Sequence, residues 1–253
     1  MSGILNKIAA RLKITFNPTG FSKIKTGYAN GIFWSHSVSD PRYLGGSYEH
    51  ELSEWLVSNL KQGKSFIDVG ANAGYFSLIA EKYASDPNQK IIAVEPLPYN
   101  INLINSHILK NGSSKIEVVH CAVSSTVGEV DFSDSGNPSA NTYVKESSLY
   151  KSYPKIKVKT TTLDNLVEKY ELKNFIVKID VEGAELDVLI GFVESLKKYK
   201  PELILATHDC HVEGVEKECI ELLVYHGYKV IPLHEMKEVS GQKDYHCYVP
   251  VTI

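Results

Sequence analysis

The residues best suited to chemistry lie around a glycine-containing stretch, Phe66 to Ala80, which reads FIDVGANAGYFSLIA. Asp68 precedes the turn formed by Gly70, Asn72 and Gly74. Glycine, and less readily asparagine, adopts the positive φ of a tight turn, and glycine lets a ligand approach the backbone. The apolar run before the turn predicts a buried parallel strand, and the apolar spacing after it predicts a helix. We therefore expect the turn at the carboxyl end of a strand, where open α/β sheets bind ligands and free N–H groups favour an anion.

A second carboxylate is expected to share this site. Residues 91–94 form another apolar strand, and Glu95 ends it at about the twenty-residue distance typical of ribose recognition. The two carboxylate oxygens of Glu95 can accept hydrogen bonds from two adjacent hydroxyls, and the charge strengthens each bond. Pro96 stops the strand and is counted with the cofactor-binding residues.

The spacing of the glycines separates the possible ligands. A dinucleotide-binding turn reads G-x-G-x-x-G, whereas this turn reads G-x-x-x-G and lacks the middle glycine. It resembles the first motif of class I S-adenosylmethionine (SAM)-dependent methyltransferases, with Asn72 where the second glycine usually stands. The DVGAN-x-G variant, KIDVEGAE from Lys178 and VKTTTLDNL from Val158 together resemble the FkbM methyltransferase family, from about Tyr48 to the C-terminus.

This resemblance implies an α/β fold, a cofactor and a class of acceptor. The fold would be a Rossmann-like, seven-stranded sheet, mostly parallel with an antiparallel edge strand at 246–249, and with helices on both faces. SAM would be the methyl donor, and the product would be an O-methylated hydroxyl of a sugar, glycan or other small metabolite. The SAM site would comprise Asp68, Gly70, Asn72, Gly74, Glu95 and Pro96, with Cys121 and Ala122 beside the adenine.

Within that site each group has an expected task. Asp68 would orient the turn and the ammonium group of the donor, the backbone of residues 70–74 would take the methionyl part, and Glu95 would take the ribose. Cys121 has an equally simple interpretation as a small buried apolar residue.

A hydroxyl acceptor must lose its proton, and three residues at the ends of two later strands are candidates for this chemistry. Asp180 ends the strand at 175–179, and His208 and Asp209 follow the strand at 202–207. We expect Asp180 and His208 to be catalytic, because a histidine titrates near neutral pH. Asp180 and Asp209 could instead hold Mg²⁺ through hard oxygen ligands. Glu182 and Glu185 are interpreted as helix-capping residues.

The remaining organisation is simple. Residues 1–47 are interpreted as an N-terminal extension, and residues 48–253 as the methyltransferase domain. Two short strands, at 130–132 and 156–160, flank a polar loop from Ser133 to Pro154 that we expect to cover the acceptor.

Composition excludes some partners. The net charge of −3 gives no electrostatic case for nucleic acid, and no long uncharged apolar run predicts a membrane span. The four cysteines form no CxxC pair, so a reducing cytoplasm is the expected location. Two alternatives stay open: a nucleotide-dependent oxidoreductase, which the missing glycine disfavours, and a non-catalytic SAM-binding or partner-binding protein.

Overall fold

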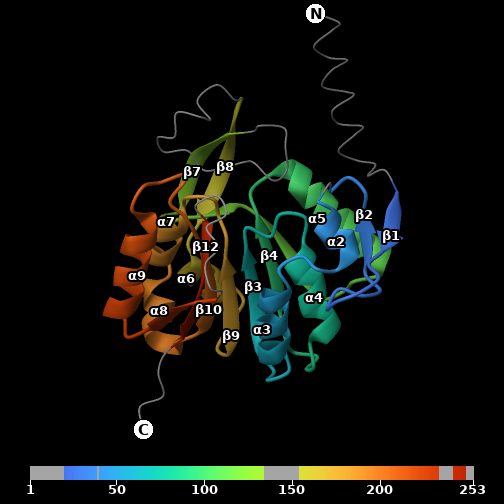
Figure 1. Cartoon of the computed structure of the whole chain (residues 1–253). Helices are drawn as coiled ribbons and strands as arrows, with labels where there is room; N and C mark the ends of the chain where they lie inside the picture. The colour runs from blue at the N-terminus through green and yellow to red at the C-terminus, as the bar shows by residue number, and fades with distance from the viewer. Residues whose placement is uncertain (1–19, 39, 134–153, 234–241, 249–253) are drawn as a thin grey trace, which may run out of the picture.

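A computed structural model describes residues 20–38, 40–133, 154–233 and 242–248. Its centre is a seven-stranded sheet with the order β11-β12-β10-β9-β3-β4-β5, in which β12 alone runs antiparallel to its neighbours (Figure 1). The strands are β3 (Ser65–Val69), β4 (Ile91–Glu95), β5 (Ile116–His120), β9 (Phe175–Ile179), β10 (Glu202–His208), β11 (Lys229–Pro232) and β12 (Gln242–Tyr248). This sheet confirms the predicted fold class.

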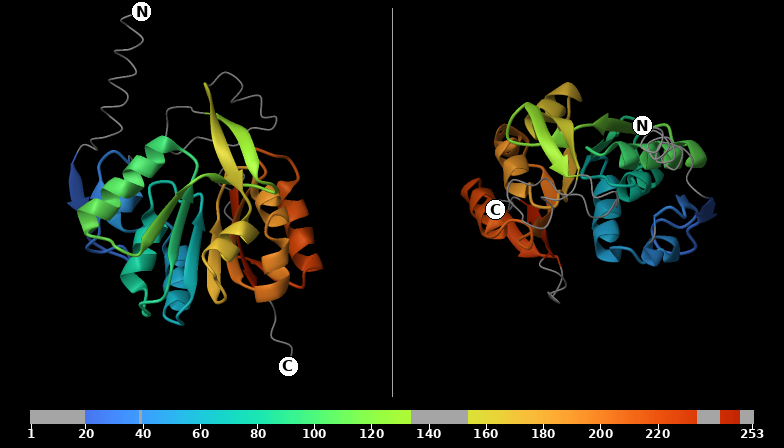
Figure 2. Two further views of the ribbon diagram at one scale, coloured as in Figure 1. Left: turned by 180° about the vertical axis from the view of Figure 1, so that it is seen from behind. Right: turned by 90° about the horizontal axis from the view of Figure 1, so that it is seen from above.

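Helices cover both faces of the sheet because its inner strands are apolar on both faces (Figures 1 and 2). In β3, for example, Phe66 packs against one helical layer and Ile67 against the other. The first layer contains α3 (His50–Leu60), α4 (Tyr75–Tyr83) and α5 (Pro98–Asn111). The second contains α6 (Leu163–Lys169), α7 (Glu185–Ile190), α8 (Val193–Tyr199) and α9 (Val215–Tyr225).

The antiparallel strand does not lie where the sequence predicted it. We expected it at the edge, but β12 pairs with β10 on one side and β11 on the other, so β11 is the edge strand. Burial explains the position, since Cys247 in β12 is fully buried whereas β11 is largely exposed. The last apolar strand thus takes the more protected position.

The predicted helix after Asp180 is also shorter than expected. It splits into α7 and α8 at Gly191, where an added Cβ would lie 2.3 Å from the carbonyl oxygen of Ser124. Val188 and Leu189 are the buried apolar residues of α7, while Ile190 is 46% exposed. The close approach of the segment that contains Ser124 therefore separates α7 from α8 at Gly191.

Above the carboxyl end of the sheet lies a small three-stranded sheet (Figure 2). It contains β6 (Ala122–Val123), β7 (Gly128–Ser133) and β8 (Lys155–Thr161). Strands β7 and β8, which pair antiparallel, include the two short strands predicted at 130–132 and 156–160. The predicted acceptor-covering loop between β7 and β8 falls almost wholly outside the described residues.

The residues ahead of α3 join the same packed core. They form β1 (Phe21–Lys23), β2 (Phe33–Ser35) and α2 (Pro41–Gly45). Trp34 is fully buried and stacks on His107 of α5 with ring centroids 4.1 Å apart. Part of the predicted extension therefore packs against the helices that carry the glycine turn, and the boundary at residue 47 stays a prediction. None of the described helices combines the length and apolar composition that a bilayer crossing requires.

Candidate active site

The glycine turn is fixed by its contact with the next strand of the sheet. Gly70 has a φ of 78°, and an added Cβ would lie 1.9 Å from the carbonyl oxygen of Asp180. Asn72 and Gly74 also have positive φ values, of 52° and 83°. Position 70 therefore requires glycine both for its positive φ and for its close contact with Asp180. This contact holds the turn directly beside Asp180.

His107 supports the same turn from behind. Its Nε2 accepts a hydrogen bond from the Ser35 N–H at 3.0 Å, so its Nδ1 carries the proton that is donated to the Ala73 carbonyl at 2.9 Å. Burial lowers the pKa of His107 to about 4, which keeps the ring neutral and this bonding pattern intact. No local pattern indicates this link, since the partners of His107 are 34 and 72 positions away.

Glu95 lies next to the turn and is held by donors on its own loop and on the turn. Its Oε2 accepts from the Asn72 N–H at 2.8 Å, and its Oε1 accepts from the Leu97 N–H at 3.0 Å and the Asn100 side-chain amide at 3.1 Å. The side chain is 3% exposed, and burial raises its pKa to about 7 despite these bonds. Glu95 is thus oriented in advance, with acceptor capacity left on each oxygen.

A pocket opens over this turn, and its lining fits the predicted cofactor. Backbone of the turn and Glu95 supply polar groups, while Leu97, Cys121 and Val123 supply a flat apolar surface. Asn100 adds a buried side-chain oxygen that has no hydrogen-bond partner in the described structure. Such a set suits a ligand with a ribose and an aromatic base. The predicted cofactor residues that line the pocket are Gly70, Asn72, Glu95, Pro96, Cys121 and Ala122.

Asp68 has a different position from the one predicted. It is 1% exposed, is not among the described residues that line the pocket, and accepts a hydrogen bond from the Ser77 hydroxyl of α4 at 2.7 Å. Burial raises its pKa, although Lys178 and Ser77 oppose that shift. Asp68 therefore reaches the turn through α4 and through Lys178 of β9.

The Lys178 side chain of β9 lies near carboxylates at the carboxyl ends of both β3 and β9. No role was predicted for it from the sequence. Its Nζ lies 3.0 Å from Asp180 Oδ2 and 3.8 Å from Asp68 Oδ1, and the side chain is almost fully buried. Burial alone would lower the pKa of Lys178, but the carboxylates of Asp180, Asp68 and Glu49 raise it. The lysine thus stays charged and stabilises two buried carboxylates.

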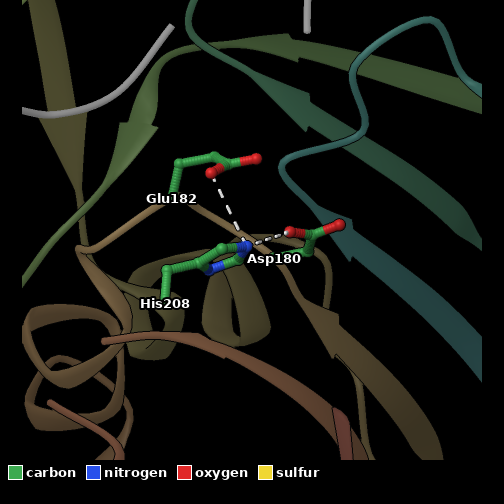
Figure 3. A group of neighbouring side chains, drawn as sticks. All are labelled: Asp180, Glu182 and His208. Atoms are coloured by element: carbon green, nitrogen blue, oxygen red, sulfur yellow. Dashed lines mark ion pairs between the residues drawn. The ribbon is translucent and has the colours of Figure 1, made fainter. Parts of the chain in front are cut away.

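Beyond Lys178, three side chains from the ends of β9 and β10 converge (Figure 3). The His208 Nε2 lies 3.7 Å from Asp180 Oδ1 and 3.6 Å from Glu182 Oε2. The opposite ring nitrogen, Nδ1, lies 2.7 Å from Oε1 of the buried Glu185. Both predicted catalytic residues, Asp180 and His208, are therefore brought together.

The protonation of this group follows from its neighbours. Burial alone would lower the pKa of His208, but the hydrogen bond to Glu185 and the carboxylates of Asp180 and Glu182 raise it to about 9. Burial likewise would raise the pKa of Asp180, but Lys178 and His208 lower it. The ring is thus protonated at neutral pH, and Asp180 is ionised.

Two sequence interpretations change at this point. Asp209 is not brought to Asp180: it is exposed and its Oδ1 accepts a hydrogen bond from the Glu216 N–H at the start of α9. The predicted metal pair is therefore replaced by the convergence of Asp180, Glu182 and His208. Glu185 does not cap α7 as predicted, since its Oε1 bonds the Gly183 N–H and the His208 ring.

Aromatic side chains from the N-terminal segment form another wall of the pocket. Tyr43 and Tyr48 both line it and stack with ring centroids 4.0 Å apart, and Tyr75 meets Tyr48 edge-on at 5.6 Å. The guanidinium of Arg42 lies 5.1 Å from the centroid of the Tyr48 ring. Neither tyrosine was predicted to lie at the site, because no local pattern indicates that α2 places Tyr43 at this pocket.

Comparison with known proteins bears on this site. The model of the methyltransferase FkbM domain matches residues 68–230, which include the glycine turn, Glu95, Asp180 and His208. The chain belongs to the FkbM methyltransferase family. As a member of this family it is a SAM-dependent methyltransferase, and the oxidoreductase alternative is set aside.

Individual relatives are more distant. The chain is 26% identical over 204 residues to methyltransferase sdnD of Sordaria araneosa, covering 69% of this chain and 77% of that protein. It is 27% identical over 150 residues to hexuronic acid methyltransferase AglP of Haloferax volcanii, covering 59% of this chain and 58% of AglP.

Solved structures share the fold at low identity. Methyltransferase FkbM from Methylobacillus flagellatus superposes with a TM-score of 0.53 and 13% identity, covering 97% of this chain and 60% of that one. An rRNA methylase from Streptococcus thermophilus superposes with a TM-score of 0.51 and 9% identity, covering 79% and 95%.

Proposed function

We propose that this FkbM-family protein transfers the methyl group of SAM to a hydroxyl oxygen of a sugar or sugar-like acceptor. The observation that carries the proposal is that one pocket is lined both by the glycine turn with Glu95 and by Asp180 and Glu182 at the end of β9. The first set suits the donor, and the second supplies negative charge and a neighbouring histidine beside the acceptor.

The aromatic wall supports the sugar-like acceptor. Flat rings such as Tyr43 and Tyr48 can pack against the apolar face of a sugar ring while neighbouring polar groups bond its hydroxyls. AglP, a relative of low identity, is named as a hexuronic acid methyltransferase, which agrees with such an acceptor.

The chain's own residues have four tasks in this reaction. The turn and Glu95 bind the donor, the tyrosines orient the acceptor, and the pocket excludes water so that oxygen and methyl carbon are held in line. Bound SAM supplies an electrophilic methyl group on a sulfonium. We assign the hydroxyl proton to the ionised Asp180, while the protonated His208 ring, 3.7 Å away, stabilises the charged form of that carboxylate. The acceptor oxygen gains the methyl group, and the electrons of the broken carbon–sulfur bond stay on sulfur.

Transfer assays with SAM labelled in its methyl group test the proposal. Candidate acceptors are neutral monosaccharides, hexuronic acids and their oligosaccharides, with a purine nucleoside and a short RNA as contrasting acceptors. We expect label in a carbohydrate product and none in the RNA. Label that appears only in nucleic acid or protein would overturn the proposal.

A chemical test separates two kinds of O-methylation. If a hexuronic acid is the acceptor, methylation of a hydroxyl gives an ether that resists mild alkali, whereas methylation of the carboxylate gives an ester that releases methanol. We expect an alkali-stable product, because removal of a hydroxyl proton is the task assigned to Asp180. Quantitative release of labelled methanol would contradict that assignment.

A further inference from the structure

The arrangement around the His208 ring leaves one buried polar atom without a partner. His208 is 2% exposed and its Nε2 has no hydrogen-bond partner in the described structure, although it points at Asp180 and Glu182 (Figure 3). The separations of 3.7 and 3.6 Å are too long for hydrogen bonds. A protonated Nε2 would therefore have no hydrogen bond of normal length to either carboxylate.

The same distances suit a shared cation. One ligand atom from each of Asp180, Glu182 and His208 can be chosen so that all lie within 4.8 Å of one another. Ligands bound about 2.1 Å from one ion lie about 3–4 Å apart, which is the spacing seen at Nε2. Counting Glu185, three carboxylates face this imidazole, while Lys178 pairs with Asp180 and the His211 ring bonds Glu182. With both imidazoles neutral, the carboxylates and the lysine leave an excess of negative charge that a divalent ion would neutralise.

Neighbouring side chains hold these ligand atoms in orientations that suit metal binding. Glu185 holds Nδ1 of His208 at 2.7 Å, which directs Nε2 toward the two carboxylates, and Lys178 holds the other oxygen of Asp180 at 3.0 Å. A carboxylate behind a metal-binding histidine fixes its orientation and raises its basicity. Glu182, with a positive φ of 56°, is placed beside the ring by the tight turn that precedes α7.

From this geometry we propose that Asp180, Glu182 and His208 bind a divalent transition-metal ion, of the Mn²⁺ or Zn²⁺ class, with an open position toward the pocket. An imidazole ligand favours such ions over Mg²⁺, which prefers a shell of oxygen ligands. Asp180 and Glu182 line the pocket, so a hydroxyl bound at the open position would have a lowered pKa and could release its proton to water. This catalytic part rests on the proposed function, whereas the ion binding does not.

The test is a titration with Mn²⁺ of the full-length protein, first freed of metal with a chelator, in which the free ion is followed by electron paramagnetic resonance. We expect one tightly held Mn²⁺ per chain, displaced by Zn²⁺ but not by an equal concentration of Mg²⁺. Glu182→Gln should weaken binding at least tenfold, and since this side chain is partly exposed the variant should fold. His208→Gln is the second variant and should also weaken Mn²⁺ binding at least tenfold.

Asp209→Asn is the matched comparison, because it removes the other carboxylate at the end of β10 and retains a capping side chain for α9. Binding should be unchanged in this variant. Equal Mn²⁺ binding by the wild type, Glu182→Gln and His208→Gln would overturn the ion site, as would tighter binding of Mg²⁺ than of Mn²⁺.

Methyl transfer separates the two proposals. Transfer lost on chelation and restored by Mn²⁺ supports the catalytic role of the ion. Full transfer by chelated protein would overturn that role and leave Asp180 as the direct proton acceptor. Bound Mn²⁺ without transfer to any carbohydrate would overturn the proposed function while the ion site stands.

Discussion

The carboxyl ends of β3 and β4 differ from those of β9 and β10 in how they satisfy buried charge. Glu95, after β4, is surrounded by neutral donors: two backbone N–H groups and an amide. Asp180, after β9, is surrounded by charged side chains, with Lys178 at 3.0 Å and His208 at 3.7 Å. The carboxylate of the donor half is therefore held mainly by backbone and other neutral donors. The acceptor half depends on a balance of charges, so the loss of one member should affect all the others.

The largest expected effect is the removal of the lysine that the two halves share. Lys178→Met leaves Asp68 and Asp180 without their buried cation, and we expect the free energy of unfolding to fall by about 3–5 kcal/mol. Urea denaturation followed by circular dichroism measures this loss. The exposed pair of Lys197 and Glu194, 3.0 Å apart, supplies the control, since Lys197→Met should change stability by less than about 0.5 kcal/mol. Similar losses in both variants would contradict the charge-balance account.

Gly70→Ala should have the next largest effect, because it strains the contact between the halves. The variant places a Cβ only 1.9 Å from the Asp180 carbonyl oxygen. We expect the free energy of unfolding to fall by about 2–4 kcal/mol. Gly63 has the same φ of 78° but nothing within 4 Å, so Gly63→Ala should cost only about 1 kcal/mol. Thermal and urea unfolding of the two variants measure these changes. Equal losses of unfolding free energy would show that φ alone, and not the contact with Asp180, decides the destabilisation.

The same contrast explains what the sequence could predict. The turn, the place of Glu95 at a strand end and the positions of the strands along the chain follow from local spacing and from apolar runs, and these parts agree with the structure. His107, Tyr43 and the contacts of Glu182 and Glu185 with His208 join residues far apart in the chain, so no local pattern indicates them. Asp209 was a reasonable metal candidate by its place at a strand end, but the start of α9 takes its carboxylate. Which of two adjacent strand-end residues faces a site depends on the loop that follows.

A smaller effect should appear in the pH dependence of SAM binding. Glu95 has a pKa of about 7 in the folded protein because of burial, and its ionised form accepts hydrogen bonds at both oxygens. We expect affinity to rise about tenfold as pH increases from about 6 to 8. Equilibrium titrations across this range should give a flat profile for Glu95→Gln, and a wild-type slope in that variant would exclude Glu95 as the source.

The corresponding effect on stability has the opposite sign. Because folding raises the pKa of Glu95, its neutral form is favoured in the folded state, and its stabilising contribution is fully present below the unfolded value of about 4.5. That contribution is lost as pH rises through about 7. Glu95→Gln should therefore unfold with less pH dependence between these values than the wild type.

Asn72→Gly is expected to have the smallest effect. Its backbone N–H, not its side chain, donates to Glu95, and glycine adopts the φ of 52° more freely than asparagine. We expect SAM affinity to change by less than about threefold, or about 0.7 kcal/mol. Calorimetric titration would detect a tenfold loss, which would instead assign the Asn72 side chain a direct contact with the ligand.

The central claim, that one pocket binds the donor on one half and activates the acceptor on the other, is tested most directly by measuring S-adenosylhomocysteine binding to two variants. Glu95→Ala should weaken binding by about 5- to 150-fold, the scale of 1–3 kcal/mol for a lost charge-assisted bond. Glu182→Gln should bind within about twofold of the wild type. Equal weakening in both variants would contradict the account, because it would place Glu182 in the donor half.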